Sequence, residues 1–137
     1  MKQAVYDRLT GDTQLMALLP GGLHTTAEIS RQATPTAFDA NSELMPCALL
    51  KLGSVIPAGP YETSAQQTIE IFLYHPSGFT ALSAVVNRVY QLLNRQRLEP
   101  SSGTCWGIQH DNDTPEDEDP ALGVPMRRSR YVAFIRR

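Results

Sequence analysis

Cys105, His110 and Asp111 have the side chains that a nucleophile, a general base and an orienting acid would need. Cys105 and His110 both lie in the run Thr104–His110, which we expect to be a strand. Residues five positions apart on a strand point to opposite faces, so these two side chains should not meet. No helix N-terminus or glycine-rich elbow that would lower a thiol pKa lies near Cys105. We therefore expect a buried cysteine, a histidine at a strand end and no catalytic residues.

Acidic side chains dominate residues 111–119, and their carboxylates are of the type that binds hard cations such as Ca²⁺. The six acids are Asp111, Asp113, Glu116, Asp117, Glu118 and Asp119. The run begins like a calcium loop, but its sixth position is Glu116, where an EF-hand requires glycine, and its twelfth is Leu122 in place of a bidentate glutamate. We expect the segment Asp111–Pro120 to be a solvated acidic loop, or a docking patch for a basic partner, and to hold no metal.

Other ligand patterns are equally incomplete. His24, His75 and His110 lie in different expected elements and lack the ligand spacing of a zinc site. The turns at residues 20–22 and 57–60 lack the lysine and spacing of a phosphate loop. Cys47 and Cys105, the two cysteines of the chain, both fall in apolar runs and are expected to be buried. We expect no cofactor.

The charges are balanced overall but segregated along the chain. Twelve Lys and Arg against fourteen Asp and Glu give a net charge of −2, which excludes a uniformly basic nucleic-acid binder. Five of the twelve follow the acidic run at Arg127, Arg128, Arg130, Arg136 and Arg137. Because they lack the strand-face aromatics of an RNA-binding platform, these arginines indicate a salt-bridged protein interface. The longest apolar stretches, such as Ile69–Tyr74, are far shorter than the roughly 20 residues of a membrane-spanning helix.

The elements that position these residues follow from hydrophobic periodicity. We expect a short helix over Gln3–Leu9 and a second one that is capped by Asp12 or Thr13 and ends at Leu19. We also expect a principal helix over Phe79–Arg95, capped by Ser77 or Thr80. Expected strands are Cys47–Leu52, Thr68–Tyr74, Thr104–His110 and Arg128–Arg136, with a possible short strand at residues 23–24. Residues 24–46 are irregular, and Gly53–Gln66 is expected to be a long projecting arm.

The resulting fold class is α+β, in one domain over residues 1–137. About four antiparallel or mixed strands pack on one principal helix, with short N-terminal helices and long projecting loops. The helix covers one face of the sheet only. Phe72, Tyr74 and Phe134 point to the other face and need cover from elsewhere, for which a subunit interface is the natural candidate.

This order of elements resembles the tail terminator (tail-completion) proteins of long-tailed bacteriophages and prophages. The resemblance begins with the segment Ala4–Leu19, where a short helix runs into a "small-Asp-x-x-Leu" motif at Gly11-Asp12-Thr13-Gln14-Leu15. It continues through Pro46 and its strand, the arm, the strand Thr68–Tyr74 and the helix at Ala81–Leu93. It closes on the aromatic and basic strand Arg130–Arg136. The stretch 24–45 and the acidic insert 111–120 depart from the family pattern.

The resemblance implies a non-enzymatic virion protein, assembled in the host cytoplasm, that forms a ring of typically six subunits. Such a ring ends the polymerisation of the tail tube at its head-proximal end and docks the head-completion or neck proteins. Its interface is expected to include Phe72, Tyr74, Phe134, Arg127, Arg128 and Arg130, with the six acids facing arginines of a neighbour or of the tube. Neither membrane nor sequence-specific nucleic-acid binding is expected.

Three alternatives remain open. A head-closure or neck connector, or a minor tail protein, would be of similar size. A small cytoplasmic ligand-binding regulatory domain would show a concave polar pocket and stay a monomer or dimer. A cysteine-dependent enzyme would lose its activity on Cys105→Ala substitution.

Overall fold

The computed structural model of this chain describes residues 1–57, 59–60, 63–99 and 104–136. Its helices are α1 (Lys2–Thr10), α2 (Thr13–Leu18) and α3 (Phe79–Leu93), with a 3-10 turn, η1, at Pro35–Ala37. Its strands are β1 (Leu23–His24), β2 (Cys47–Pro57), β3 (Ser64–Tyr74), β4 (Thr104–Asp113), β5 (Asp117–Asp119) and β6 (Val124–Arg136).

All six strands join one mixed sheet in the order β1-β2-β3-β6-β4, with β5 paired to the start of β6. β1 runs parallel to β2, and the other pairs are antiparallel. The α+β class and the mixed sheet are confirmed. The possible short strand at residues 23–24 is confirmed as β1. The expected number of about four strands is nevertheless too low, because β5, with three residues, is too short to give a periodic signal.

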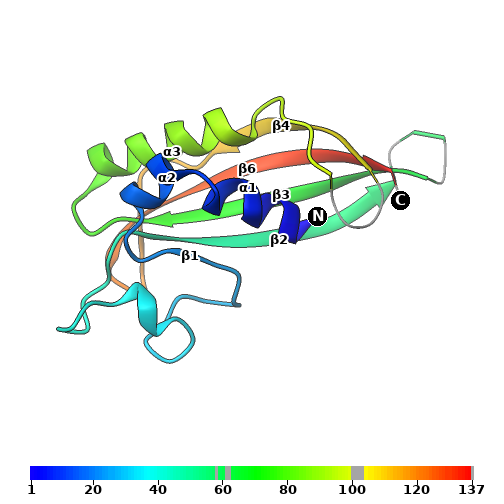
Figure 1. Ribbon diagram of the computed structural model, residues 1–137. Helices are drawn as coiled ribbons and strands as arrows, with labels where there is room; N and C mark the ends of the chain where they lie inside the picture. Colours follow the sequence, from blue (N-terminus) through cyan, green and yellow to red (C-terminus); the bar gives the residue numbers. More distant parts are fainter. Residues whose placement is uncertain (58, 61–62, 100–103, 137) are drawn as a thin grey trace.

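Three helices lie on one face of this sheet (Figure 1). The stripe predicted for α3 is buried as expected, at Leu82, Val85, Val86, Val89 and Leu93. It packs against core residues of β3 and β6 in one hydrophobic cluster, which α1 and α2 join through Val5, Leu9 and Leu15. The predicted cap of α3 by Ser77 or Thr80 is wrong: the N-cap is Gly78, at φ 112°, with no side-chain hydrogen bond.

The predicted arm at 53–66 is largely strand. β2 continues to Pro57 and β3 begins at Ser64, with Ile56 opposite Gln66 and Pro57 opposite Ala65. A register shift between Leu52 and Val55 interrupts the ladder. The polar side chains and the register shift remove the alternating apolar pattern by which a strand is recognised in a sequence. The strand forms nevertheless, because its backbone N–H and C=O groups have partners on the neighbouring strand. Residues 58, 61 and 62 of the predicted arm lie outside the described residues.

The irregular segment 24–46 covers one end of the second face of the sheet. Its Ile29 and Ala37 form a second hydrophobic cluster with Cys47, Leu49 and Tyr74. Met45 N donates to Ala37 O at 2.8 Å, and Phe38 pairs with Leu44, so the segment folds back on itself before β2. Tyr74 is therefore only 5% exposed. The expectation that this tyrosine needs cover from another subunit is wrong, because the same chain supplies it.

The predicted acidic loop is also partly strand. β4 extends through Asp113, and the acids of β5 (117–119) pair with residues 124–126 of β6. Charged residues are tolerated there because the backbone groups are hydrogen-bonded while most of the side chains remain exposed to water.

Candidate assembly surface

Glu70 of β3 lies between two of the predicted interface arginines on the second face of the sheet. Its Oε2 is 3.6 Å from Nη1 of Arg128 and its Oε1 is 3.5 Å from Nη2 of Arg130. Lys51 and Asn112 continue the same row, since Lys51 pairs with Glu70 and Asn112 pairs with Arg130. The face therefore carries three cations around one carboxylate, with net positive charge.

Arg127 does not belong to this face. Side chains alternate along β6, and Arg127 lies beside Leu73, whose side chain is in the helix-covered core. Its Nε donates to Thr114 O at 3.0 Å, and the Thr114 hydroxyl accepts from Arg128 N at 2.8 Å. The three arginines predicted as one patch thus have two roles: Arg128 and Arg130 line the second face, and Arg127 holds the turn between β4 and β5.

The three predicted interface aromatics differ in how far the chain itself covers them. Phe72 is half-buried, with Lys51 Nζ 5.6 Å from its ring centroid. Tyr74 is buried, and this burial, with the nearby charge of Asp119, raises the pKa of its hydroxyl. Phe134 is half-buried beside a shallow hollow of about 230 Å³. Phe134 is therefore more accessible to a second subunit than Tyr74 is.

The six acids are spread along one edge and end of the sheet. Asp111, Glu116, Asp117 and Glu118 are exposed, whereas Asp113 and Asp119 are half-buried. Asp119 Oδ1 accepts from the backbone N–H groups of Ala121 and Leu122 at 2.9 and 2.8 Å, which shapes the turn into β6. Within the described ranges, none of the six forms an ion pair with an arginine. Four exposed acids are therefore available to a partner.

Cys105 and His110 lie on the same face of β4, contrary to prediction. Cys105 pairs with Ile135 and Gly107 with Phe134, so Trp106 is an extra residue that shifts the alternation. His110 packs edge-on against the rings of Tyr90 and Tyr131, and its Nε2 lies 3.1 Å from Asp113.

Neither cysteine is arranged as a nucleophile. Both are buried at 0% exposure, as expected. The Cys105 thiol donates to Gly107 O at 3.7 Å, while His110 is paired elsewhere. Burial raises the pKa of Cys47 to about 12, so this thiol stays protonated and unreactive at neutral pH.

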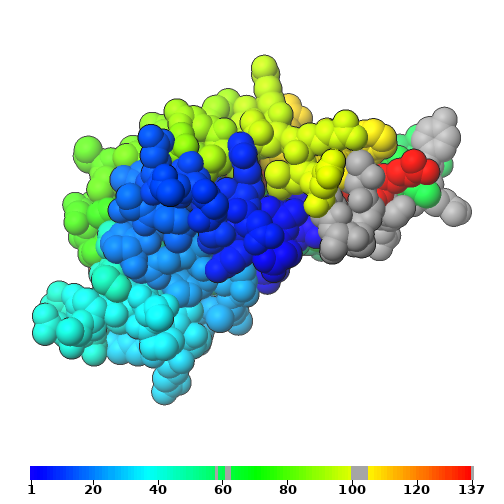
Figure 2. Space-filling view, in the orientation of Figure 1, coloured from blue at the N-terminus to red at the C-terminus, as the bar shows by residue number. Residues whose placement is uncertain are grey.

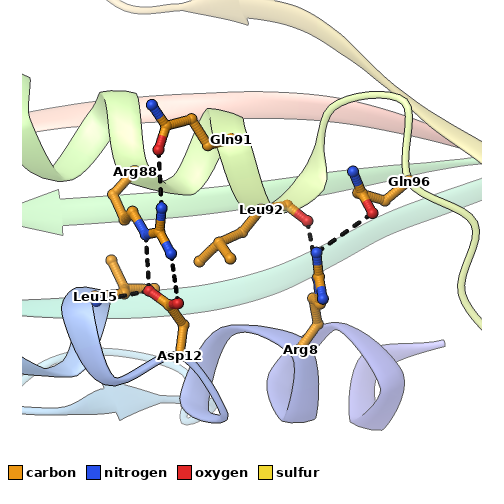
Figure 3. Close-up of polar contacts among 7 residues, drawn as sticks. All are labelled: Arg8, Asp12, Leu15, Arg88, Gln91, Leu92 and Gln96. Atoms are coloured by element: carbon orange, nitrogen blue, oxygen red, sulfur yellow. Dashed lines mark hydrogen bonds and ion pairs between the residues drawn. The ribbon is translucent and has the colours of Figure 1, made fainter.

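An ion pair across the helical layer was not predicted from the sequence (Figure 3). Asp12 accepts from Leu15 N at 2.8 Å, which confirms it as the cap of α2. The same carboxylate accepts from Arg88 of α3 through Nε at 2.8 Å and Nη2 at 2.6 Å. The Arg88 hydrogen bond lowers the pKa of Asp12 to about 2.

Arg8 of α1 completes this layer by donating to Leu92 O, near the end of α3, at 3.1 Å. The cap of α2 could be predicted from the sequence, because it depends on neighbouring residues. Its ion pair with Arg88 could not be predicted, because the two residues are 76 positions apart and such a pair produces no periodic pattern.

This arrangement of three helices over a curled mixed sheet has a counterpart among solved structures. The counterpart is a chain of a structure described as "Virion of native gene transfer agent (GTA) particle", superposed with a TM-score of 0.79. The two chains share a fold. The similarity covers 100% of this chain and 95% of the other, at 17% sequence identity. The sequence matches no protein-family model and no curated protein. No helix among the described residues is long and apolar enough to cross a membrane.

Proposed function

We propose that this protein is a structural subunit of a phage-like virion, and specifically a tail terminator. It forms a ring, typically of six copies, at the head-proximal end of the tail tube, ends tube polymerisation and presents a docking surface to head-completion or neck proteins. The observation that carries the proposal is the fold shared with a virion chain over the full length of both molecules. The role is non-enzymatic, and the protein's location is the neck of the particle.

The resemblance of the sequence to tail terminators supports the finer part of the proposal. Its "small-Asp-x-x-Leu" motif corresponds to a definite structural unit, since Asp12 caps α2 and binds Arg88 of α3. This unit fixes the short N-terminal helices on the principal helix. The motif therefore serves the fold of the subunit, and the part of the second face that segment 24–46 does not cover remains free to make contacts.

The charge distribution supports assembly of identical copies. A ring subunit makes a head-to-tail contact, in which two different patches of the same chain meet. The row of Lys51, Arg128 and Arg130 is a cationic patch, and the exposed acids of 111–118 form an anionic one at the sheet edge. We propose that these patches set the encounter and register of neighbouring subunits, while Phe72 and Phe134 contribute apolar contact.

The first test is the mass of the purified protein by size-exclusion chromatography with light scattering, together with negative-stain images. Rings, or rings at one end of tail tubes, are the expected result. A monomer of ordinary globular shape under all conditions contradicts the proposal. Immunogold labelling of intact particles then separates a tail terminator at the head-proximal tail end from a neck connector within the head or a minor tail protein elsewhere.

Arginine variants sharpen the test. The double variant Arg128→Ala/Arg130→Ala should lower the mass of the assembly, because it removes two of the three cations that surround Glu70. Arg127→Ala is the matched control, since this arginine binds Thr114 within its own chain. Equal masses for wild type and double variant count against a role of this face in assembly.

A further inference from the structure

The two ends of the sheet carry different apolar surfaces. One end of the sheet is where β2 ends and β3 begins. Four strands are in register there, at Ile56, Gln66, Phe134 and Gly107. Ile56 and Trp106, the residue before Gly107, are each 55% exposed. Large apolar side chains with that exposure, at the same end of the sheet as the half-buried Phe134, are typical of a contact surface. We call Ile56, Trp106 and Phe134 the hairpin-end patch.

The surroundings of the hairpin-end patch are basic. The Arg97 guanidinium lies 5.5 Å from the ring centroid of Trp106. Arg95 and Arg136 are also exposed at this end, and Glu99 is the acid of the same 95–99 stretch. The described residues around the patch therefore present more positive than negative charge.

At the opposite end, the segment 24–46 and the turn before β6 enclose a groove. Two hollows of about 220 and 500 Å³ share Ala121 and Leu122 in their walls. The smaller reaches Phe72 and Tyr74 on the sheet, and the larger runs beside Phe38 of the 24–46 segment. In Figure 2 this segment projects from one end of the molecule, and the red C-terminal residues of β6 lie at the other.

The groove has an acidic rim. Its lining includes Glu28, Asp39, Glu43 and Asp119 against Lys51 and Arg31. The Arg31 guanidinium is engaged within the segment, because it donates twice to Ser42 O, at 3.1 and 2.8 Å, and lies over the ring of Phe38. The groove thus complements the hairpin-end patch in charge: it is an apolar surface with an acidic rim, whereas the patch is an apolar surface with a basic one.

We infer that the hairpin-end patch of one copy inserts into the groove of the next copy. The inference rests on the proposed function and adds the apolar part of the self-contact of the ring to the charged patches proposed above. A chain cannot fill its own groove, because Leu49 in the groove wall lies seven positions before Ile56 on β2, a span of about 23 Å. Since the two surfaces differ, the contact is head-to-tail and adds copies in one direction until a ring closes.

The experiment mixes two variants that are each defective at one end. The hairpin-end variant is Ile56→Glu/Trp106→Glu, and the groove variant is Glu43→Arg/Ala121→Arg, with all four positions exposed. Leu18→Glu, at a 37% exposed apolar residue of α2, is the matched control. Light scattering gives the mass of each protein, and circular dichroism verifies that each is folded.

Each defective variant should be monomeric, with a self-dissociation constant raised at least about 30-fold, as for loss of an aromatic anchor. Leu18→Glu should assemble like wild type. An equimolar mixture of the two defective variants keeps one intact pair of surfaces and should give a 1:1 dimer that does not grow. The charge exchange Arg97→Glu/Glu43→Arg in a single chain, which reverses one exposed charge on each side, should assemble better than either single change.

Several results overturn the inference: assembly of either defective variant at wild-type strength, a mixture that stays monomeric, or a wild-type chain that never self-associates. If the defective variants still form rings, the proposed contact is wrong and the proposed function stands. If the mixture gives the 1:1 dimer but immunogold labelling never finds the protein on tails, the proposed function is wrong and the contact stands.

Discussion

Replacing Tyr131 by phenylalanine should stabilise this protein, although the tyrosine is fully buried in the core. Its exposure is 0%, and its hydroxyl oxygen is buried with no hydrogen-bond partner. Burial, with the nearby charge of Asp113, raises the pKa of this hydroxyl, so it keeps its proton at neutral pH. The folded state therefore contains a desolvated O–H group that is hydrated when the chain unfolds.

The magnitude follows from two opposing effects. An unsatisfied buried polar group costs about 1–3 kcal/mol, and Tyr131→Phe removes it. The ring keeps its edge-on packing at 5.2 Å from His110, so the substitution loses only the contacts of one oxygen atom. We expect a net gain of about 1 kcal/mol in the free energy of unfolding, or about 3–5 °C in Tm for a chain of this size. Tyr131→Ala should instead lose about 3–5 kcal/mol, because it leaves a cavity.

The assay is urea unfolding followed by circular dichroism, with calorimetry for Tm. Tyr90→Phe is the matched control: this tyrosine is 44% exposed and its oxygen accepts from Asn94 Nδ2 at 3.0 Å, so loss of its hydroxyl should give no gain. A lower unfolding midpoint for Tyr131→Phe than for wild type would refute the reasoning, since it would mean that the hydroxyl makes a favourable bond in the folded protein.

Three further predictions follow from the described contacts. The pKa of Asp12 is lowered in the folded protein, so its contribution to stability is complete above pH 3.8 and is lost as the pH falls through about 2. The variant Asp12→Asn keeps the cap but not the charge. In urea unfolding, its midpoint should therefore fall less steeply than that of wild type over this pH window. Cys47 and Cys105 should react with DTNB only at the rate of unfolding, and fast labelling in native buffer would show that the thiols are accessible. Ile29→Ala should lower the free energy of unfolding by about 2–4 kcal/mol and speed proteolysis within residues 25–46, because Ile29 anchors that segment; unchanged cleavage would show that other contacts hold it.

Local patterns were reliable where one element decides its own structure. The spacing of Leu82, Val85 and Val89 marks one side of a helix whatever lies beneath it, and all three are buried. The alternation of Ile69 and Ile71 likewise marks one side of a strand. Asp12 as a cap also needs only the next three residues. Periods of 3.6 and 2 are properties of the backbone, so these predictions needed no knowledge of partners.

Predictions failed where the answer depended on a distant segment. Tyr74 was expected to need a second subunit, but Ile29 and Ala37 cover it, and no period in residues 24–46 announces that packing. Cys105 and His110 were expected on opposite faces, and the single extra residue Trp106 reversed this. A bulge is set by the register of the neighbouring strand, which the sequence of β4 alone does not contain.

The amino-acid sequence by itself determined the fold class, the apolar side of α3, the cap of α2 and the burial of both cysteines, because each depends on residues within a few positions of one another. Tertiary structure alone decided which charges share a surface. Alternation along β6 separates Arg127 from Arg128 and Arg130, and pairing with β3 brings Glu70 between the latter two. The tertiary structure also placed segment 24–46 over the second face of the sheet, where it forms a groove at the end of the sheet away from the exposed Ile56 and Trp106. Contacts of that range are selected by the free energy of the whole chain, since each cluster gains its burial only when both of its parts are already in place.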